Sequence, residues 1–321
     1  MKLIQKYGYL FRRMRLVHYL HNWMNRDALA YLKPMYRKAG LQKSVLSSIS
    51  HKDFKKHALP ETLPWLDRPE ALSAINQRQE EWDAETETRL KQWVEKGYLV
   101  LEKGVPETLV DGINQDVEHI IERGLLPFHF SNTRVMNCIL HSEALKQLVK
   151  SPILERWLPL LLGRKVKPFQ TMNFLVGSKA RAHSDTIHMT TEPLGYLIAI
   201  WVALEDIHPD SGPVFYYPGS HKLPYVLSKG FDTGNTSLTV GKHYYENYLD
   251  HIEEMMEKEG YEKEVLIAKK GDILIWHGNL IHGGTPVINP ELSRKSLVIH
   301  YFAEDVICYH ELTQRPAIPV I

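Results

Sequence analysis

The sequence has few of the residues that build small cross-linked domains or membrane spans. Only Cys138 and Cys308 are cysteines among 321 residues, which excludes a disulfide framework and a cysteine-rich zinc site. No apolar run reaches the roughly 18 residues that a spanning helix needs. Charges interrupt the apolar stretch at the N-terminus, which argues against a signal peptide. We therefore expect a protein of the reducing cytoplasm.

Charge is balanced overall but unevenly distributed. The net charge is +1, and we expect no nucleic-acid partner. Residues 1–57 hold 13 Lys/Arg and 2 Asp/Glu, a net charge of +11, which leaves a net charge of −10 on the remainder. The basic segment is expected to meet an anionic surface, either the body of its own protein or a partner.

A basic helical extension is predicted over residues 1–85. Within residues 3–24, apolar positions recur at helical spacing and arginines occupy other positions of the turn. The spaced positions are Leu3, Tyr7, Leu10, Phe11, Met14, Val17 and His18. Packing of this helix against the acidic body is favoured over contact with an anionic membrane surface or with an acidic or phosphorylated carrier.

Residues 86–321 change from helical segments to short strands. Helices are expected at 80–95, 108–123, 142–150 and 152–162, and strands at 97–101, 169–176, 195–204, 213–217, 264–268, 272–276 and 296–302. This order predicts a mainly β domain with flanking helices, a sandwich or barrel. Residues 222–262 are polar and partly helical, and they are expected to form a long insertion or lid.

Candidate metal ligands begin with a weak pattern, because a histidine followed two residues later by Asp or Glu occurs five times. The pairs are His51/Asp53, His141/Glu143, His183/Asp185, His208/Asp210 and His251/Glu253. Only His183-Ser184-Asp185 follows an apolar stretch and a Gly177-Ser178 turn and precedes a run rich in β-branched residues, 186–191. On a strand, both of its side chains would face one side and reach one ion.

His282 is the candidate third ligand. It follows the predicted strand 272–276 and precedes two glycines, Gly283 and Gly284, which let a cofactor approach the backbone. Two histidines and one carboxylate can hold Fe(II) and leave positions open for other ligands. Taken without the His183/Asp185 pair, His282 is better explained as a hydrogen-bonded core histidine.

Three other histidines compete with these candidates. His221 belongs to a turn, and His277 is expected below the site. His188 would face away from the ion if the strand at 186–191 continued straight, and it is a candidate substrate contact.

Several ordered blocks together resemble the phytanoyl-CoA dioxygenase family of Fe(II)/2-oxoglutarate oxygenases. The similarity covers about residues 86–321 and leaves out the extension before about residue 70. Its blocks are Gly97–Leu101, His183–Asp185, Trp201–Asp206, Gly212–Lys222 and Trp276–Gly284, with Arg294 ahead of the last strand.

The resemblance implies a double-stranded β-helix, or jelly roll, with His183, Asp185 and His282 as iron ligands. Arg294 matches the arginine that pairs with the distal carboxylate of 2-oxoglutarate, a role that suits a planar guanidinium. Lys295 should face the other way. Asn173 and Trp201 match positions that approach the cosubstrate, although both could be core residues. Relatives often carry a hydrogen-bonding residue where this chain has Gly284, and Thr285 follows it.

The expected reaction, from the same resemblance, is hydroxylation of an unactivated C–H bond by Fe(II), 2-oxoglutarate and O2, with release of succinate and CO2. Related halogenases replace the carboxylate ligand, so Asp185 favours hydroxylation. The substrate is expected to be a small molecule, anionic or carrier-linked. A non-catalytic jelly-roll binding protein and a cupin-like metal enzyme without 2-oxoglutarate remain alternatives. The sequence does not predict an oligomeric state.

Overall fold

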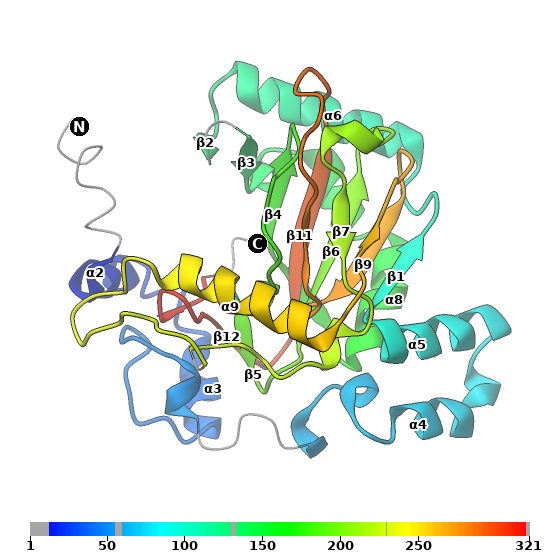
Figure 1. Ribbon diagram of the computed structural model, residues 1–321. Coiled ribbons are helices and arrows are strands. Elements are labelled where there is room, and N and C mark those ends of the chain that lie inside the picture. Colours follow the sequence, from blue (N-terminus) through cyan, green and yellow to red (C-terminus); the bar gives the residue numbers. More distant parts are fainter. Residues whose placement is uncertain (1–12, 55–59, 130–132, 229, 319–321) are drawn as a thin grey trace.

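The computed structural model describes residues 13–54, 60–129, 133–228 and 230–318. Its centre is a seven-stranded antiparallel sheet (Figure 1). In spatial order the strands are β1 (Tyr98–Leu101), β9 (Ile273–His277), β6 (Leu197–Ala203), β11 (Ser296–Ala303), β4 (Val166–Phe174), β3 (Arg134–Met136) and β2 (Phe128–His129). The mainly β architecture expected from the sequence is confirmed.

Two three-stranded sheets accompany the large one. One has the order β10 (His282–Gly284), β7 (Val214–Tyr216) and β8 (Glu264–Val265). The other has the order β13 (Arg315–Pro316), β12 (Ile307–His310) and β5 (Thr190–Glu192). Residues of β7 share a buried cluster with one face of the large sheet, so these two sheets enclose a common interior.

The two faces of the large sheet bury different partners. On β6, Ile198, Ile200 and Val202 pack with four helices, whereas Ala199 and Trp201 face the interior between the sheets. The helices are α5 (Ala84–Lys96), α6 (Glu107–Glu122), α7 (Glu143–Val149) and α8 (Pro152–Leu162). A strand buried on both faces reads as a continuous apolar run, which explains the composition of residues 195–204.

Local signals set the start of the domain. The Asp83 carboxylate caps α5 by accepting a hydrogen bond from the Thr86 amide at 2.6 Å. The helix ends at Gly97, whose φ of 77° is left-handed, and β1 follows directly. A Cβ at Gly97 would also collide with the His221 ring, so glycine is required there for two reasons.

The N-terminal extension forms α2 (Arg15–Met24), α3 (Leu32–Lys38) and α4 (Ala71–Gln77). Its apolar residues pack on Ile307 and Tyr309 of β12, so it is attached to the C-terminal part of the chain. Residues 3–12 of the expected helix lie outside the described residues. Of the predicted apolar positions in α2, His18 faces inward and is buried.

The predicted insertion carries a long helix, α9 (Tyr244–Glu259) (Figure 1). Its apolar side packs on Phe215 of β7 and on Ile281, which directly precedes β10. Single-turn 3₁₀ helices complete the secondary structure. They are η1 (His51–Asp53), η2 (Pro60–Thr62), η3 (Trp65–Asp67), η4 (Gln79–Glu81), η5 (Cys138–Leu140), η6 (Asp185–Ile187), η7 (Pro209–Ser211) and η8 (Ser220–Lys222). Among the helices of the described ranges, none combines the length and apolar character that crossing a membrane requires.

Candidate metal centre

Backbone hydrogen bonds bring two distant histidines together. The amide of His183 donates to the carbonyl of His282 at 3.0 Å, and the amide of His282 donates back at 2.9 Å. Their ring centroids are 4.6 Å apart. This isolated bridge therefore fixes the separation of two side chains that lie far apart in the sequence.

Asp185 reaches the same place by a route that the sequence does not predict. The expected strand over 186–191 is wrong for residues 186–189, because Asp185–Ile187 forms the 3₁₀ turn η6 and strand β5 begins at Thr190. A turn, and not the alternation of a strand, directs the carboxylate toward the two imidazoles.

Both imidazoles are oriented by their own loops. Nδ1 of His183 contacts the carbonyl of Arg181 at 2.8 Å, and Nδ1 of His282 contacts the carbonyl of Leu280 at 3.0 Å. A ring that donates from Nδ1 keeps an unprotonated Nε2, the form that binds a metal. Burial lowers the pKa of His183 to about 3, so its imidazole is neutral at neutral pH.

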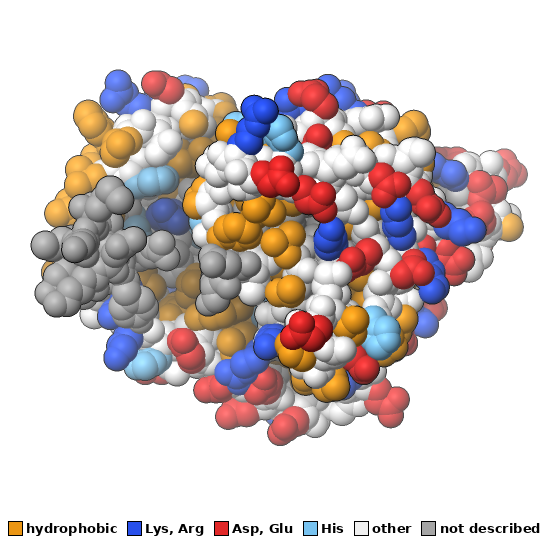
Figure 2. All heavy atoms as spheres, turned by 90° about the horizontal axis from the view of Figure 1, so that it is seen from above, with side chains coloured by type: hydrophobic (Ala, Val, Ile, Leu, Met, Phe, Trp, Pro, Cys, Tyr) orange, Lys and Arg blue, Asp and Glu red, His pale blue; other side chains and the backbone are white. Residues whose placement is uncertain are grey.

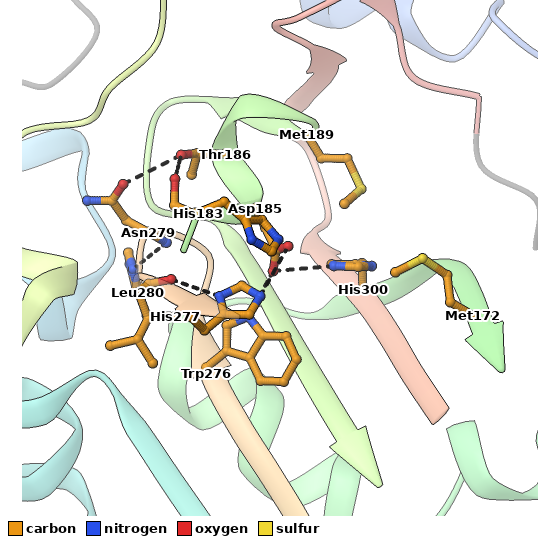
Figure 3. A network of polar contacts seen from close by, with 12 residues as sticks. Met172, His183, Asp185, Thr186, Met189, Trp276, His277, Asn279, Leu280 and His300 are labelled. Carbon is orange, nitrogen blue, oxygen red and sulfur yellow. Dashed lines mark hydrogen bonds and ion pairs between the residues drawn. The ribbon is translucent and has the colours of Figure 1, made fainter. Parts of the chain in front are cut away.

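The Asp185 carboxylate is held through one oxygen (Figure 3). Its Oδ2 accepts a hydrogen bond from the Trp276 indole at 2.8 Å and lies 3.3 Å from His300 Nε2. Its Oδ1 faces His282 Nε2 at 3.8 Å. Burial alone would raise the pKa of Asp185, but the neighbouring His300 and His282 outweigh burial and lower it, so the carboxylate is ionised.

The three side chains offer ligand atoms that all lie within 4.8 Å of one another. Atoms bound to one ion at about 2.1 Å are roughly 3 to 4 Å apart, so small shifts would complete the coordination. The set could hold a metal ion while leaving other coordination positions free.

The ligand set opens into a cavity of about 330 Å³ that also contains Arg294. Arg294 is only 3% exposed, and it makes no ion pair within the described ranges. It donates a short hydrogen bond to the Ser296 hydroxyl and lies over the rings of Phe174 and Trp201, at 5.2 and 6.0 Å from their centroids. Burial lowers the pKa of Arg294 to about 10, which leaves it charged at neutral pH. A buried charge of this kind is costly without a counter-ion, so the cavity favours an anionic ligand.

Several cavity residues have no assigned role in the sequence analysis. His300, on β11, contacts Asp185, and Arg134, on β3, lines the wall. Alternating apolar residues surround His300, which was the available signal, whereas nothing around Arg134 distinguished it from a surface arginine. His188 also lines the cavity, 4.9 Å from the ring of Tyr245 on α9. The chain turns at η6 and does not continue as a straight strand, so His188 faces the cavity.

Two predicted cosubstrate residues do not reach the cavity. Asn173 is buried on the opposite face of β4, near Asn114 and Glu118 of α6, whereas its neighbours Met172 and Phe174 line the cavity. Strand alternation excludes Asn173 from the site for this reason. Thr285 is not among the lining residues, and its amide donates to the Pro213 carbonyl at 2.9 Å.

Glycine at 284 has a structural explanation. A Cβ there would lie 2.5 Å from the hydroxyl oxygen of Ser178, which itself lines the cavity. The serine hydroxyl therefore occupies the space that a side chain at 284 would need. A polar group is present at this point even though residue 284 does not supply it.

The other candidate residues lie partly in the cavity wall and partly outside it. His277 contacts the Asp67 carboxylate at 3.0 Å, and His221 belongs to the turn η8; neither lines the cavity. Lys295 points away from Arg294 and pairs with Glu118 at 2.9 Å. Trp201 does line the cavity.

Comparison with known proteins agrees with this arrangement. The family model described as Phytanoyl-CoA dioxygenase (PhyH) matches residues 93–296, well over half of the chain. The chain belongs to the phytanoyl-CoA dioxygenase family. The family resemblance inferred from the sequence is thereby confirmed.

Curated members of the phytanoyl-CoA dioxygenase family match parts of the chain. "Phytanoyl-CoA dioxygenase domain-containing protein 1" of Rattus norvegicus is 32% identical over 170 residues, which are 52% of this chain and 52% of that protein. The Bos taurus protein of the same name is 31% identical over 87 residues, 27% of this chain and 28% of that protein. The chain thus spans about half or less of the length of these relatives.

Solved structures share the fold. The non-heme alpha ketoglutarate dependent carbocyclase SnoK superposes with a TM-score of 0.60 at 16% identity, covering 75% of this chain and 95% of SnoK. EctD from S. alaskensis with bound Fe gives a TM-score of 0.54 at 18% identity, covering 69% of this chain and 77% of EctD. The predicted jelly-roll fold with an N-terminal helical extension is confirmed.

Proposed function

We propose that this protein is an Fe(II)/2-oxoglutarate-dependent dioxygenase that hydroxylates an unactivated C–H bond of a small molecule, with release of succinate and CO2. The observation that carries the proposal is a single cavity containing both the His183–Asp185–His282 set and the buried Arg294. Two histidines and a carboxylate are the ligands of non-haem Fe(II) oxygenases. Structural neighbours named as alpha ketoglutarate dependent or as bound to Fe support it.

The donor set suits ferrous iron. The hydrogen bonds to Arg181 and Leu280 leave both imidazoles with an unprotonated nitrogen, and Asp185 keeps Oδ1 for the metal while Trp276 and His300 hold Oδ2. Bound iron with 2-oxoglutarate and O2 supplies the oxidising power that no side chain provides. The protein's own task is to fix these ligands and exclude water.

Arg294 and Ser296 are the groups that would hold the far carboxylate of 2-oxoglutarate. The guanidinium can donate two parallel hydrogen bonds, and the Ser296 hydroxyl lies directly beside it. Phe174 and Trp201 restrict the guanidinium from the sides. An anion bound here would compensate the buried charge of the guanidinium.

The substrate would occupy the remaining volume. We assign Arg134, His188 and Tyr245 to its binding, because they line the cavity and take no part in the ligand set. Methionines make up much of the apolar wall, namely Met136, Met172 and Met189. A cavity of about 330 Å³ is near the small end of ligand sites, which favours a small substrate or the reactive end of a carrier-linked one. Arg134 favours an anionic group on that substrate.

The test is anaerobic calorimetry with Fe(II) and then 2-oxoglutarate, followed by succinate formation in air. Wild-type protein should bind both, and His282→Ala should lose Fe(II) affinity by about a hundredfold or more. His208→Ala is the matched control, since His208 also precedes an aspartate by two residues but lies outside the cavity.

The outcomes separate the proposal from its alternatives. Iron binding without 2-oxoglutarate binding would favour a cupin-like metal enzyme. Absence of any Fe(II) binding by the wild-type protein would contradict the proposal and leave a non-catalytic binding protein.

A further inference from the structure

Helix α2 is attached to the protein by its polar side. Asn22 is buried and its side-chain amide donates to the Leu46 carbonyl at 3.0 Å. Arg15 donates to the carbonyl of Thr236 at 3.1 Å and to the side chain of Gln314. His18 is the other buried residue of the helix. The contacts that fix α2 are therefore mainly polar.

The opposite side of α2 is apolar and exposed to solvent. Five large side chains share it because they recur at intervals of three and four residues. They are Leu16 (64% exposed), Tyr19 (45%), Leu20 (51%), Trp23 (51%) and Met24 (77%). This orientation is the reverse of the usual one, in which an amphipathic surface helix turns its apolar side to the core.

Exposed apolar residues are concentrated on this side of the molecule. Of the thirteen large hydrophobic residues that are exposed in the described ranges, five lie within residues 16–24. Leu238, 75% exposed, adjoins them, because its carbonyl accepts a hydrogen bond from the Arg15 amide at 2.9 Å. Figure 2 shows hydrophobic side chains gathered at the left edge, the side on which Figure 1 places α2. A concentration of this kind marks a contact surface.

The segment that carries this apolar face is basic. Arg26 is exposed and its guanidinium lies 5.3 Å from the Trp23 ring centroid. Lys33, Arg37 and Lys38 are also exposed. Over residues 1–57 as a whole, 13 Lys/Arg stand against 2 Asp/Glu. Pairing of two such segments in a dimer would bring like charges together, which disfavours a second copy as the occupant.

We propose that the apolar face of α2 docks this protein on an anionic lipid surface. Leucines with a tryptophan and a tyrosine beside basic residues are typical of helices that lie in the membrane interface. The ten residues of α2 are too few to cross a bilayer, so the helix would lie parallel to the surface. This surface is separate from the metal cavity, and the proposal does not depend on the proposed function.

The experiment is co-sedimentation of the full chain with phosphatidylcholine vesicles that contain or lack phosphatidylserine. Wild-type protein should bind the vesicles that contain phosphatidylserine, and added salt should weaken binding. Leu16→Gln/Leu20→Gln/Trp23→Gln, which places a good helix former at each of the three positions, should reduce binding by about tenfold or more. Leu125→Gln/Leu140→Gln/Ile288→Gln is the matched control, because these residues are also exposed but lie elsewhere.

Wild-type protein that fails to sediment with either vesicle type would overturn the proposal, as would equal binding to vesicles without phosphatidylserine. Sedimentation velocity provides the second measurement. A dimer that the α2 variant converts to a monomer would show that another copy covers this face, and would also overturn the proposal.

Discussion

Two buried carboxylates in the described part of the chain, Asp185 and Glu311, each lie beside a histidine, but only Asp185 lines the cavity of the metal centre. At the metal centre, Asp185 lies 3.8 Å from His282 and 3.3 Å from His300. In the other cluster, Glu311 contacts His51 Nδ1 at 2.7 Å and accepts a hydrogen bond from the Ser228 hydroxyl at 2.8 Å. In this second cluster, the side chains of His51, Ser228 and Glu311 are held by hydrogen bonds to one another.

The difference separates a binding site from a structural contact. In the first cluster each ligand histidine uses one nitrogen on its own backbone, and the remaining groups face open volume. In the second, Glu311 joins segments far apart in the chain, since it accepts hydrogen bonds from the Ser228 hydroxyl and, at 3.1 Å, from the His51 amide. Burial and residue type are alike in both. The two clusters differ in whether the side-chain atoms that could bind a ligand face a cavity or are hydrogen-bonded to other protein groups.

The largest expected effects come from removing each carboxylate in turn and measuring both protein stability and Fe(II) affinity. Glu311→Ala removes the acceptor of three buried hydrogen bonds and should lower the free energy of unfolding by about 3 to 5 kcal/mol, while Fe(II) affinity stays unchanged. Asp185→Ala should abolish Fe(II) binding with a much smaller loss of stability. Urea unfolding and anaerobic calorimetry measure the two quantities.

Glu291→Ala, at an exposed position, is the control for charge removal. If Glu311→Ala weakened Fe(II) binding as strongly as Asp185→Ala, the distinction between the two clusters would fail.

Low pH should destabilise the fold through buried histidines that have no carboxylate beside them. Burial, with the nearby His277, lowers the pKa of His221 to about 2, and burial lowers that of His310 to about 4. The unfolded chain, with an ordinary pKa near 6.5, then binds protons more readily than the folded protein. Stability is therefore complete above about pH 6.5 and falls as the pH drops toward these lower values, by about 2 kcal/mol per histidine at pH 5.

Urea unfolding of the metal-free protein at pH 7.5 and pH 5 measures this loss. His221→Gln should make the loss smaller by about 2 kcal/mol, whereas the exposed His208→Gln should not change it. An equal pH dependence in wild type and His221→Gln would show that His221 does not stay neutral in the fold.

The smallest expected effect concerns the support of Asp185. Trp276→Phe keeps the ring but removes the indole N–H that donates to Oδ2 at 2.8 Å. Loss of a group that orients a ligand typically weakens metal binding by about tenfold or more. Anaerobic Fe(II) titration measures it, and Trp201→Phe, in the same cavity but without this hydrogen bond, is the comparison. Equal Fe(II) affinities of the two variants would show that the Trp276 hydrogen bond does not contribute to metal binding.

Sequence patterns with a clear physical period gave the correct predictions. The apolar run at 195–204 became the central strand β6, and α8 spans the predicted residues 152–162. The polar insertion contains α9, which adds Tyr245 to the cavity wall. The division into residues 1–85 and 86–321 stays a prediction, and Leu66 and Ile75 of the first part lie in the core of the second.

Three features of the structure differ from what motif position and local pattern suggest. A straight strand after His183 would have turned His188 away, but η6 turns it inward. Asn173 was chosen for its position in a motif, yet the alternation of β4 directs it toward α6. The inward side of α2 is fixed by polar contacts with Leu46, Thr236 and Gln314, none of which is close in sequence.

The sequence by itself determined the family, the strand-rich fold and the residue types at the metal centre, because periodic burial and short motifs are written locally in the chain. Only the tertiary structure decided which histidines converge, that Arg294 is buried without an ion-pair partner in the described part of the chain, and which side of α2 faces solvent. Each of these depends on contacts between segments far apart in sequence, such as the backbone bridge between His183 and His282. Spacing along the chain carries no information about such contacts.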